Sequence, residues 1–505
     1  MKLSSKQSTL RQMKADAVAV FISEDKKLFQ DELQELRKIF GKRIDSFVEL
    51  ENFKGKNDQV VLFHTEKKIA SPRLYIAGLG EQKHLSLEQF RRSAANVSKA
   101  AQKANIKHVA FQLFHTQELE NGNKFSIQDI ASATAEGAYL SLYKFDKYFT
   151  EKKDDKKNIQ EITIFDSNRT TFRDLQKKLK EVQIICEGTT LTRNLSNAPS
   201  NEIYPETLAQ AAKQSAERVG YKATIWDKKR IEKEGFGGLL AVNSGSAREP
   251  RFIILEHNSN KKLDTIVLIG KGITFDSGGI SLKPSNGMSE MKMDMSGAAA
   301  VIGTIETAAR LKLPIHLVGL IPATENLPSG SAMKPGDIIK HYGGKTSEVD
   351  NTDAEGRLIL ADAIAYASNF KPKIVIDLAT LTGACVVALG QHATGMFGND
   401  DELMTKLKKA GEKTFERVWQ LPLYDEYEKQ IKSDVADVKN IGGKWAGAIT
   451  AALFLKKFLP EDKELKWVHL DIAGTAILEE ALPYSPKGGS GVGVRLLIEF
   501  LKNYQ

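Results

Sequence analysis

The first 150 residues alternate between short apolar runs and polar segments in which apolar residues recur at helical spacing. The apolar runs, rich in Val, Ile, Leu and Phe, lie at 16–22, 59–64, 73–78 and 108–114, and the helical segments include 29–40 and 85–104. A charged stretch without apolar residues follows at 151–158 and is typical of a linker. We therefore predict a small α/β domain over residues 1–158.

A connecting region comes next. Residues 159–165 have the composition of one more strand, and apolar residues keep helical period from 170 to about 195. Pro199 and the asparagines around it break that pattern. We predict a linker strand and a bridging helix over residues 159–190, followed by a larger domain over 191–505.

The larger domain alternates between strands and helices. Strands are predicted at 251–255, 265–270, 315–321, 373–378 and 467–471. Helices are predicted at 206–218, 295–311, 357–369, 401–416, 444–458 and 492–503. This alternation predicts an α/β fold with an open, mostly parallel sheet covered by helices on both faces. Sheets of this kind place their sites beyond the carboxyl ends of the strands.

Composition narrows the class of protein. The chain has 505 residues, 41% of them hydrophobic and 27% charged, as in soluble globular proteins. No apolar run reaches the roughly 18 residues of a membrane helix, and the run Val18–Ile22 is too short for a signal peptide. Two cysteines, Cys186 and Cys385, make neither a disulfide framework nor a thiolate metal site. We predict a cytoplasmic protein without membrane contact.

The net charge of +8 is concentrated at the beginning of the chain. Residues 1–190 hold 33 Lys and Arg against 26 Asp and Glu. Acids are interleaved with these cations, which favours a solvated surface over a track for nucleic acid. A DNA-binding or regulatory role of this basic region remains the alternative to an enzymatic function alone.

The segment Asn351–Leu358 contains the closest spacing of candidate functional residues in the chain. Asp353 and Glu355 are followed by Arg357 and then by an apolar run of helix formers. Buried charges need partners, and one guanidinium cannot neutralise two carboxylates. A metal cation is therefore the predicted partner.

Two further segments carry acids and lysines near predicted strand ends or helix starts. Lys271, Asp276 and Lys283 follow the strand 265–270, in an order that does not match a phosphate-binding loop. Asp294 precedes an Ala-rich helix, where an acid can also simply complement the helix dipole. Four carboxylates converging at one sheet edge would repel one another, and two divalent ions would resolve this. The absence of His and Cys from these segments favours Mg, Mn or a carboxylate-ligated Zn.

These segments resemble the leucyl aminopeptidase family of dinuclear metallo-exopeptidases. Asn351–Leu358 matches the family signature residue for residue. The resemblance covers roughly residues 187–505 and includes Gly270–Pro284, Met291–Ala300, Leu327–Gly330, Asp377–Ala384 and His469–Thr475. It implies hydrolysis of peptides from their N-terminus, with leucine and other apolar residues preferred, by water activated between two metal ions.

The resemblance also implies a ligand set for two ions, Mn²⁺ or Zn²⁺, in each subunit. Lys271, Asp276, Asp294 and Glu355 would hold the tighter ion. Asp276, Asp353 and Glu355 would hold the more exchangeable one, so that Asp276 and Glu355 bridge. A lysine ligand must be neutral, which requires a depressed pKa.

Two catalytic residues that are not ligands are implied as well. Lys283 would polarise the scissile carbonyl. Arg357 would hold a bicarbonate ion that acts as general base, which suits the segments of the implied ligands, because none of them contains histidine. Asp294 and a metal would bind the free α-amine of the substrate, so that only N-terminal residues are removed.

The remaining implied positions concern the substrate and the assembly. Thr380, Leu381 and Gly383 would grip the substrate, and Met291 and Met293 would line the first side-chain pocket, where plain core packing is the alternative role. Gly488–Arg495 departs from the residues that are common in the family, which affects side-chain preference and not the chemistry. The family assembly is a homohexamer, a dimer of trimers. A two-metal phosphohydrolase would also need clustered carboxylates, but it gives no reason for Lys271 and Lys283.

Overall fold

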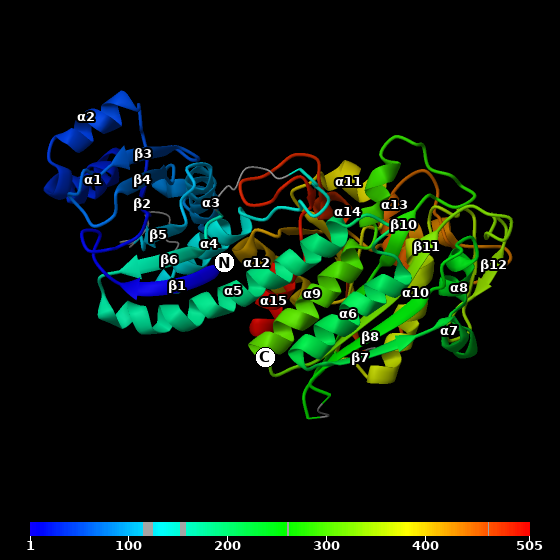
Figure 1. Cartoon of the computed structure of the whole chain (residues 1–505). Coiled ribbons are helices and arrows are strands. Elements are labelled where there is room, and N and C mark those ends of the chain that lie inside the picture. The colour runs from blue at the N-terminus through cyan, green and yellow to red at the C-terminus, as the bar shows by residue number, and fades with distance from the viewer. Residues whose placement is uncertain (115–124, 152–157, 260–261, 463, 505) are drawn as a thin grey trace. The chain divides into compact units, whose positions relative to one another are not determined.

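The computed structural model describes residues 1–114, 125–151, 158–259, 262–462 and 464–504 (Figure 1). The chain forms two compact units. The first comprises Met1–Cys186 and Glu480–Pro486, and the second comprises Glu187–Glu479 and Lys487–Gln505. Most of the linker expected at 151–158 lies outside the described residues.

The first unit is built on a six-stranded sheet with the order β1-β6-β5-β2-β4-β3. Its strands are β1 (Lys2–Gln7), β2 (Ala17–Ile22), β3 (Val60–His64), β4 (Arg73–Gly78), β5 (His108–Gln112) and β6 (Glu161–Asp166). Its helices are α1 (Lys26–Phe40), α2 (Arg43–Leu50), α3 (Leu87–Lys103) and α4 (Ile127–Leu140). Every strand pair is parallel except β3 with β4. The four strands predicted here from the sequence are confirmed.

The region between the predicted domains is ordered. The strand expected at 159–165 is β6, and it pairs with both β1 and β5 inside the first unit's sheet. The bridging helix is α5 (Arg169–Asn197), which the sequence predicted from 170 to about 195. Residues of α5 belong to both units.

The second unit contains a nine-stranded sheet with the order β16-β15-β18-β14-β9-β11-β8-β7, and β10 pairs with β11. The strands β18, β14, β9 and β11 are parallel, which confirms the mostly parallel sheet, whereas β7, β8 and β15 run antiparallel to their inner neighbours. Its strands are β7 (Lys222–Trp226), β8 (Arg251–His257), β9 (Thr265–Gly270), β10 (Gly272–Asp276), β11 (His316–Asn326), β14 (Ile374–Ala379), β15 (Thr394–Gly398), β16 (Val418–Gln420) and β18 (Lys466–Asp471). Two smaller sheets use β12 (Ile338–Lys340), β13 (Thr346–Glu348), β17 (Val438–Lys439), β19 (Ile477–Leu478) and β20 (Gly488–Gly489).

Helices cover both faces of this sheet (Figure 1). They are α6 (Pro205–Val219), α7 (Lys228–Glu234), α8 (Gly237–Asn243), α9 (Ser296–Leu311), α10 (Gly356–Tyr366), α11 (Gly383–Leu389), α12 (Asp401–Thr414), α13 (Gly447–Lys456), α14 (Ala473–Ala476) and α15 (Val494–Lys502). The layer with α6, α9 and α15 packs on one face, and the layer with α8, α10 and α13 on the other. All six helices predicted for this domain are therefore present, and the central strands β9, β11, β14 and β18 are buried between the layers except at the first residue of β9, β11 and β18. Within the described residues, no helix has the length and the hydropathy needed to cross a bilayer.

Candidate metal centre

The loop between β9 and β10 places one lysine and one acid in the core. Lys271 follows the last residue of β9 and is 3% exposed, and Asp276 ends β10 and is 2% exposed. Asp276 is held by the backbone N–H of Gly278 at 2.9 Å and by the side-chain amide of Asn326 at 2.8 Å, both donating to Oδ1. The other carboxylate oxygen of Asp276, Oδ2, faces the ammonium group of Lys283, whose Nζ atom lies 2.9 Å away.

The turn before α10 supplies the other acids, as the sequence predicted. Glu355 directly precedes the helix and is 1% exposed, whereas the side chain of Asp353 is 32% exposed. Gly356 begins the helix, and a Cβ atom there would lie 2.5 Å from Cε of Lys271. Glycine at this position therefore lets the lysine side chain pass close to the helix start.

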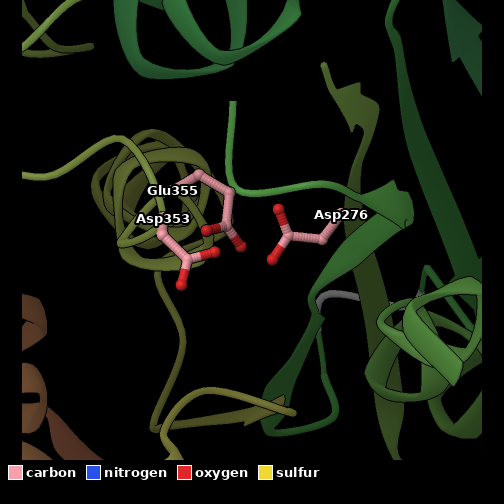
Figure 2. Close-up of side chains that lie close together, drawn as sticks. All are labelled: Asp276, Asp353 and Glu355. Atoms are coloured by element: carbon pink, nitrogen blue, oxygen red, sulfur yellow. The ribbon is translucent and has the colours of Figure 1, made fainter. Parts of the chain in front are cut away.

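Three carboxylates from these two regions converge. Asp276, Asp353 and Glu355 each offer an oxygen, and these oxygens all lie within 4.8 Å of one another (Figure 2). Glu355 Oε2 is buried without a hydrogen-bond partner among the described residues. A buried carboxylate oxygen without a partner is costly, so this donor set fits a divalent cation well.

Asp294 joins the same cluster through Lys271. It lies two residues before α9, and its carboxylate is 2.8 Å from Lys271 Nζ. The same ammonium lies 2.9 Å from Glu355 Oε1 and donates to the carbonyl oxygen of Thr380 at 3.0 Å. Lys283 makes the matching link on the other side, 2.5 Å from Asp353 Oδ1. The structure thus brings together four acids and two lysines that are far apart in the sequence.

Burial and mutual repulsion shift the pKa values of these groups. Burial raises the pKa of Glu355 to about 6, and the nearby carboxylate of Asp276 adds to the shift. Burial also raises the pKa of Asp294 and of Asp353. For Lys271, burial alone would lower the pKa, but the carboxylates of Asp294 and Glu355 outweigh it and raise the pKa. The cluster therefore attracts positive charge strongly.

The guanidinium of Arg357 lies in the core, where one of its nitrogens is hydrogen-bonded to the backbone. It is 7% exposed, and its Nη1 donates to the carbonyl oxygen of Asn440 at 2.8 Å. Burial lowers its pKa to about 10, which leaves the group charged at neutral pH. Its Nε is buried without a hydrogen-bond partner among the described residues, so the guanidinium retains a donor for an anion.

The residues expected to contact substrate lie on two segments. Met291 and Met293 belong to the 3₁₀ turn Met288–Met293, where Met293 is buried and Met291 is half-buried. Thr380 and Leu381 follow β14 and are half-buried, and a Cβ atom on Gly383 would meet open space. Thr380 reaches the acids directly, because its Oγ1 donates to Asp294 Oδ1 at 2.7 Å.

Comparison with known proteins decides the family. A model of the catalytic domain of the cytosol aminopeptidase family matches residues 190–498, and a model of the family's N-terminal domain matches residues 17–152. The chain belongs to the cytosol aminopeptidase family. It is accordingly a metal-dependent aminopeptidase, a hydrolase, and the resemblance seen in the sequence is confirmed.

Relatives in this family cover nearly the whole chain. A probable cytosol aminopeptidase of Syntrophotalea carbinolica is 45% identical over 472 residues, which are 93% of each chain. One of Chloroherpeton thalassium is 41% identical over 522 residues, covering both chains fully. Among solved structures, a mutant tomato leucine aminopeptidase has a TM-score of 0.88 with 32% identity, covering 100% of this chain and 97% of that one. The bottromycin maturation enzyme BotP in complex with Mn has a TM-score of 0.84 with 32% identity, covering 97% and 99%.

Three supporting residues of this family member were not singled out in the sequence. Asn326 ends β11 and fixes Asp276, while the carbonyl oxygen of Asn440 orients Arg357. Asp471 ends β18, and its carboxylate accepts hydrogen bonds from the backbone N–H groups of Leu381 and Thr382 at 3.1 and 3.4 Å. Only Asp471 stood in a segment that carried the resemblance, and its role depends on the pairing of β14 with β18, which spacing along the chain does not reveal.

Proposed function

We propose that the chain releases N-terminal amino acids, preferably leucine and other apolar residues, from peptides with the help of two divalent cations, Mn²⁺ or Zn²⁺. The observation that carries this proposal is the convergence of Asp276, Asp353 and Glu355, where Glu355 Oε2 is buried without a hydrogen-bond partner in the described part of the chain. Family membership supports the reaction class, and the complex of BotP with Mn supports the use of a divalent metal.

Two overlapping sets of residues would hold the two cations. Lys271, Asp276, Asp294 and Glu355 would hold one, and Asp276, Asp353 and Glu355 would hold the other, so that Asp276 and Glu355 belong to both sets. The carboxylates of Asp294 and Glu355 raise the pKa of Lys271, so its amine would become a ligand only if cations replaced the ammonium as their counter-charge. Metal binding at this site would therefore release a proton from Lys271.

Lys283, Arg357 and Asp294 would each have a separate role in the reaction. When bound, the two cations would activate a water molecule and polarise the scissile carbonyl. Lys283 would turn its ammonium from Asp276 and Asp353 towards the carbonyl oxygen and stabilise the developing negative charge. Arg357 would hold bicarbonate through its spare donors, and this anion would accept the proton of the water. Asp294 would accept a hydrogen bond from the substrate's α-amine.

The substrate would lie between two segments. Backbone groups of Thr380, Leu381 and Gly383 would hold it, and Met291 and Met293 would line an apolar pocket for its first side chain. Flexible methionines accommodate several apolar shapes, and one methylene group is worth only about 1–3 kcal/mol of discrimination. A preference for leucine with tolerance of other apolar residues follows. We also propose that the enzyme is cytoplasmic, in line with the names of its relatives.

Metal removal tests the proposal. After exhaustive dialysis against a chelator, hydrolysis of Leu-p-nitroanilide should cease, and Mn²⁺ or Zn²⁺ should restore it. Metal content is measured in parallel by atomic emission, with two ions per chain expected at full activity. Full activity of protein shown to be metal-free would refute the two-cation mechanism.

A further inference from the structure

A short segment of the chain between β19 and β20 belongs to the first unit. The chain leaves the second unit after Glu479 and returns to it at Lys487, and the residues between them, Glu480–Pro486, are part of the first unit. The strands on either side, β19 and β20, pair with each other in the second unit. We name Glu480–Pro486 the anchored segment. Both of its ends continue directly into the second unit.

Tyr484 fastens the anchored segment to the first unit. Its side chain is 6% exposed and packs in the core of that unit, and its hydroxyl donates to Glu88 Oε2 at 2.8 Å. Glu88 is itself buried beside Arg91, whose Nη1 lies 3.7 Å from the same oxygen. A hydrogen bond to a carboxylate is roughly twice as strong as one between neutral groups. The ring and the hydroxyl of Tyr484 are therefore both held in place.

Helix α3 holds a second point of the anchored segment. Lys99 Nζ donates to the carbonyl oxygen of Leu482 at 3.2 Å. Lys99 lies about three turns after Glu88, on the same face of the helix. Inside the segment, the backbone N–H groups of Leu482 and Ser485 each donate to the carbonyl oxygen of the other, at 2.8 and 3.4 Å. The anchored segment is therefore a tight turn that the first unit fixes at two points.

The chain that follows the anchored segment reaches the proposed side-chain pocket. β20 begins at Gly488, where a Cβ atom would lie 3.9 Å from Cε of Met293. The backbone N–H of Gly489 donates to Asn197 Oδ1 at 2.9 Å, and the carbonyl oxygen of Asn197 accepts a hydrogen bond from Lys292 Nζ at 3.0 Å. Asn197 thus connects β20 to the 3₁₀ turn that carries Met293. The backbone of β20 lies directly behind this part of the pocket wall.

β20 has little support of its own. It contains only Gly488 and Gly489, which have no side chains to pack, and so short an antiparallel pair is marginal by itself. Asn197 supports it on one side. On the other side the support comes from the anchored segment, which ends at Pro486, two residues before the strand. The position of β20 therefore depends on how firmly the first unit holds that segment.

We propose that the first unit positions the wall of the first side-chain pocket through the anchored segment, with Tyr484 as the positioning residue. By holding this segment, the first unit keeps β20 against Met293 and keeps the pocket in the shape that favours leucine. The identity of the pocket rests on the proposed function. The first unit contains none of the proposed metal ligands, and this role gives it a part in the selection of substrates.

Two variants of the full-length, metal-loaded chain separate anchoring from folding. Tyr484→Phe keeps the ring and removes the hydroxyl that donates to Glu88. Insertion of Gly-Ser-Gly between Pro486 and Lys487 leaves Tyr484 in its place and slackens its connection to β20. Tyr148→Phe, at a tyrosine of the same unit that is 52% exposed, is the control.

Kinetics with leucyl and alanyl p-nitroanilides measures the pocket. Both variants should raise KM for the leucyl substrate and lower the leucyl-to-alanyl ratio of kcat/KM by about tenfold, the low end of what one methylene contact contributes in an apolar pocket. The values of kcat and of the metal content should stay close to those of the unaltered chain, because the loss of contacts made equally in the ground and transition states raises KM alone. Tyr148→Phe should change none of these quantities.

Hydrogen–deuterium exchange adds a measurement that needs no activity. The backbone N–H groups of Met288–Met293 and of β20 should exchange faster in both variants, because a wall that is held less firmly opens more often. Those of β9 and β14 should keep their rates. If peptide hydrolysis is absent, this comparison still decides whether the first unit holds the wall.

Three results would overturn the inference. The first is an unchanged leucyl-to-alanyl ratio in the insertion variant, or unchanged exchange at Met288–Met293. The second is an equal loss of activity on the two substrates, because that pattern indicates a disturbed metal centre. The third is a loss of stability in Tyr484→Phe without a change in the ratio, which would confine Tyr484 to the stability of the first unit.

Discussion

Lys283 joins two of the converging carboxylates with a single ammonium group. It lies 2.9 Å from Asp276 and 2.5 Å from Asp353. Burial alone would lower the pKa of Lys283, but the carboxylates of Asp276 and Asp353 outweigh it and raise that pKa. A lysine that pairs with carboxylates of the candidate metal centre could help to maintain the metal ions or could take part in catalysis. A substitution of Lys283 separates these two roles.

We expect Lys283→Ala to lower kcat by about 10²–10³, the usual effect of removing one oxyanion donor, and to leave two metal ions bound. Activity on Leu-p-nitroanilide and metal content are measured on the same sample. Lys334→Ala removes a surface lysine paired with Asp337 and serves as the control. Loss of metal from Lys283→Ala would show instead that this lysine maintains the centre.

Asp471 holds the segment after β14 through hydrogen bonds to its backbone. Its carboxylate is 1% exposed and accepts the hydroxyl of Thr382 at 2.6 Å as well as the two backbone N–H groups that precede α11. Thr382 in turn accepts the N–H of Cys385 at 3.0 Å and so caps α11. Asp471 therefore positions the loop proposed to hold substrate.

For Asp471→Asn we predict a fall in kcat/KM of about tenfold, with KM rising and metal content unchanged, because one charge-assisted acceptor becomes a donor. Thr382→Val should show the same pattern, whereas Thr382→Ser keeps the hydroxyl and should remain close to the unaltered enzyme. Steady-state kinetics with a leucyl dipeptide measures these effects. An unchanged KM in both Asp471→Asn and Thr382→Val would exclude a positioning role.

At the scale of elements, helix α1 contains a half-buried acid, Glu32, whose protonation makes the stability of the first unit depend on pH. Glu32 Oε2 accepts the backbone N–H of Ser23, the residue after β2, at 2.8 Å. Burial raises the pKa of Glu32 from its ordinary value of 4.5 to about 7, against the lowering effect of the Ser23 hydrogen bonds. Between those two pH values the folded state holds a proton that the unfolded state has lost. Stability therefore falls as pH rises through this range.

Glu32→Gln should remove this dependence and leave the hydrogen bond from Ser23 in place. The variant should be more stable than the unaltered chain by up to about 3 kcal/mol at pH 8, with a smaller difference at pH 5. Urea unfolding at both pH values measures the difference, and Glu35→Gln on the exposed face of α1 is the matched control. A gain that is equal at both pH values would show that burial of Glu32 does not raise its pKa.

Apolar composition and length, more than burial alone, decided which strands the sequence could predict, since the short buried strands β10 and β15 were missed. The buried strands β2, β4, β9, β11, β14 and β18 carry continuous apolar runs and were all found. β1 was missed because it is a polar strand, with only Leu3 buried, and β7 because most of its residues are half-buried. The four acids of the candidate site were singled out because each stands near a strand end or a helix start. The supporting residues Asn326, Asn440 and Asp471 act through contacts between segments that are distant in the sequence, and local patterns do not contain such contacts.

At the scale of the whole molecule, the second unit exposes large apolar side chains. Val387 on α11 is 90% exposed and Trp445, two residues before α13, is 72% exposed. These two helices pack on each other, and a Cβ atom on Gly447 would lie 3.2 Å from the Cβ of Ala384. Exposed apolar residues in one area are typical of surfaces that bind another chain. This area is consistent with the hexamer that the family resemblance implies.

We therefore predict that sedimentation equilibrium will give six times the chain mass of 55.9 kDa. Val387→Glu combined with Trp445→Glu should shift the population to smaller species, because a charge buried at an apolar contact costs several kcal/mol unless it is paired. Lys334→Glu adds an acid at an exposed position of the same unit and should leave the mass unchanged. A monomer mass for the unaltered chain would refute the hexamer, and an intact hexamer of the double variant would place its contacts elsewhere on the surface.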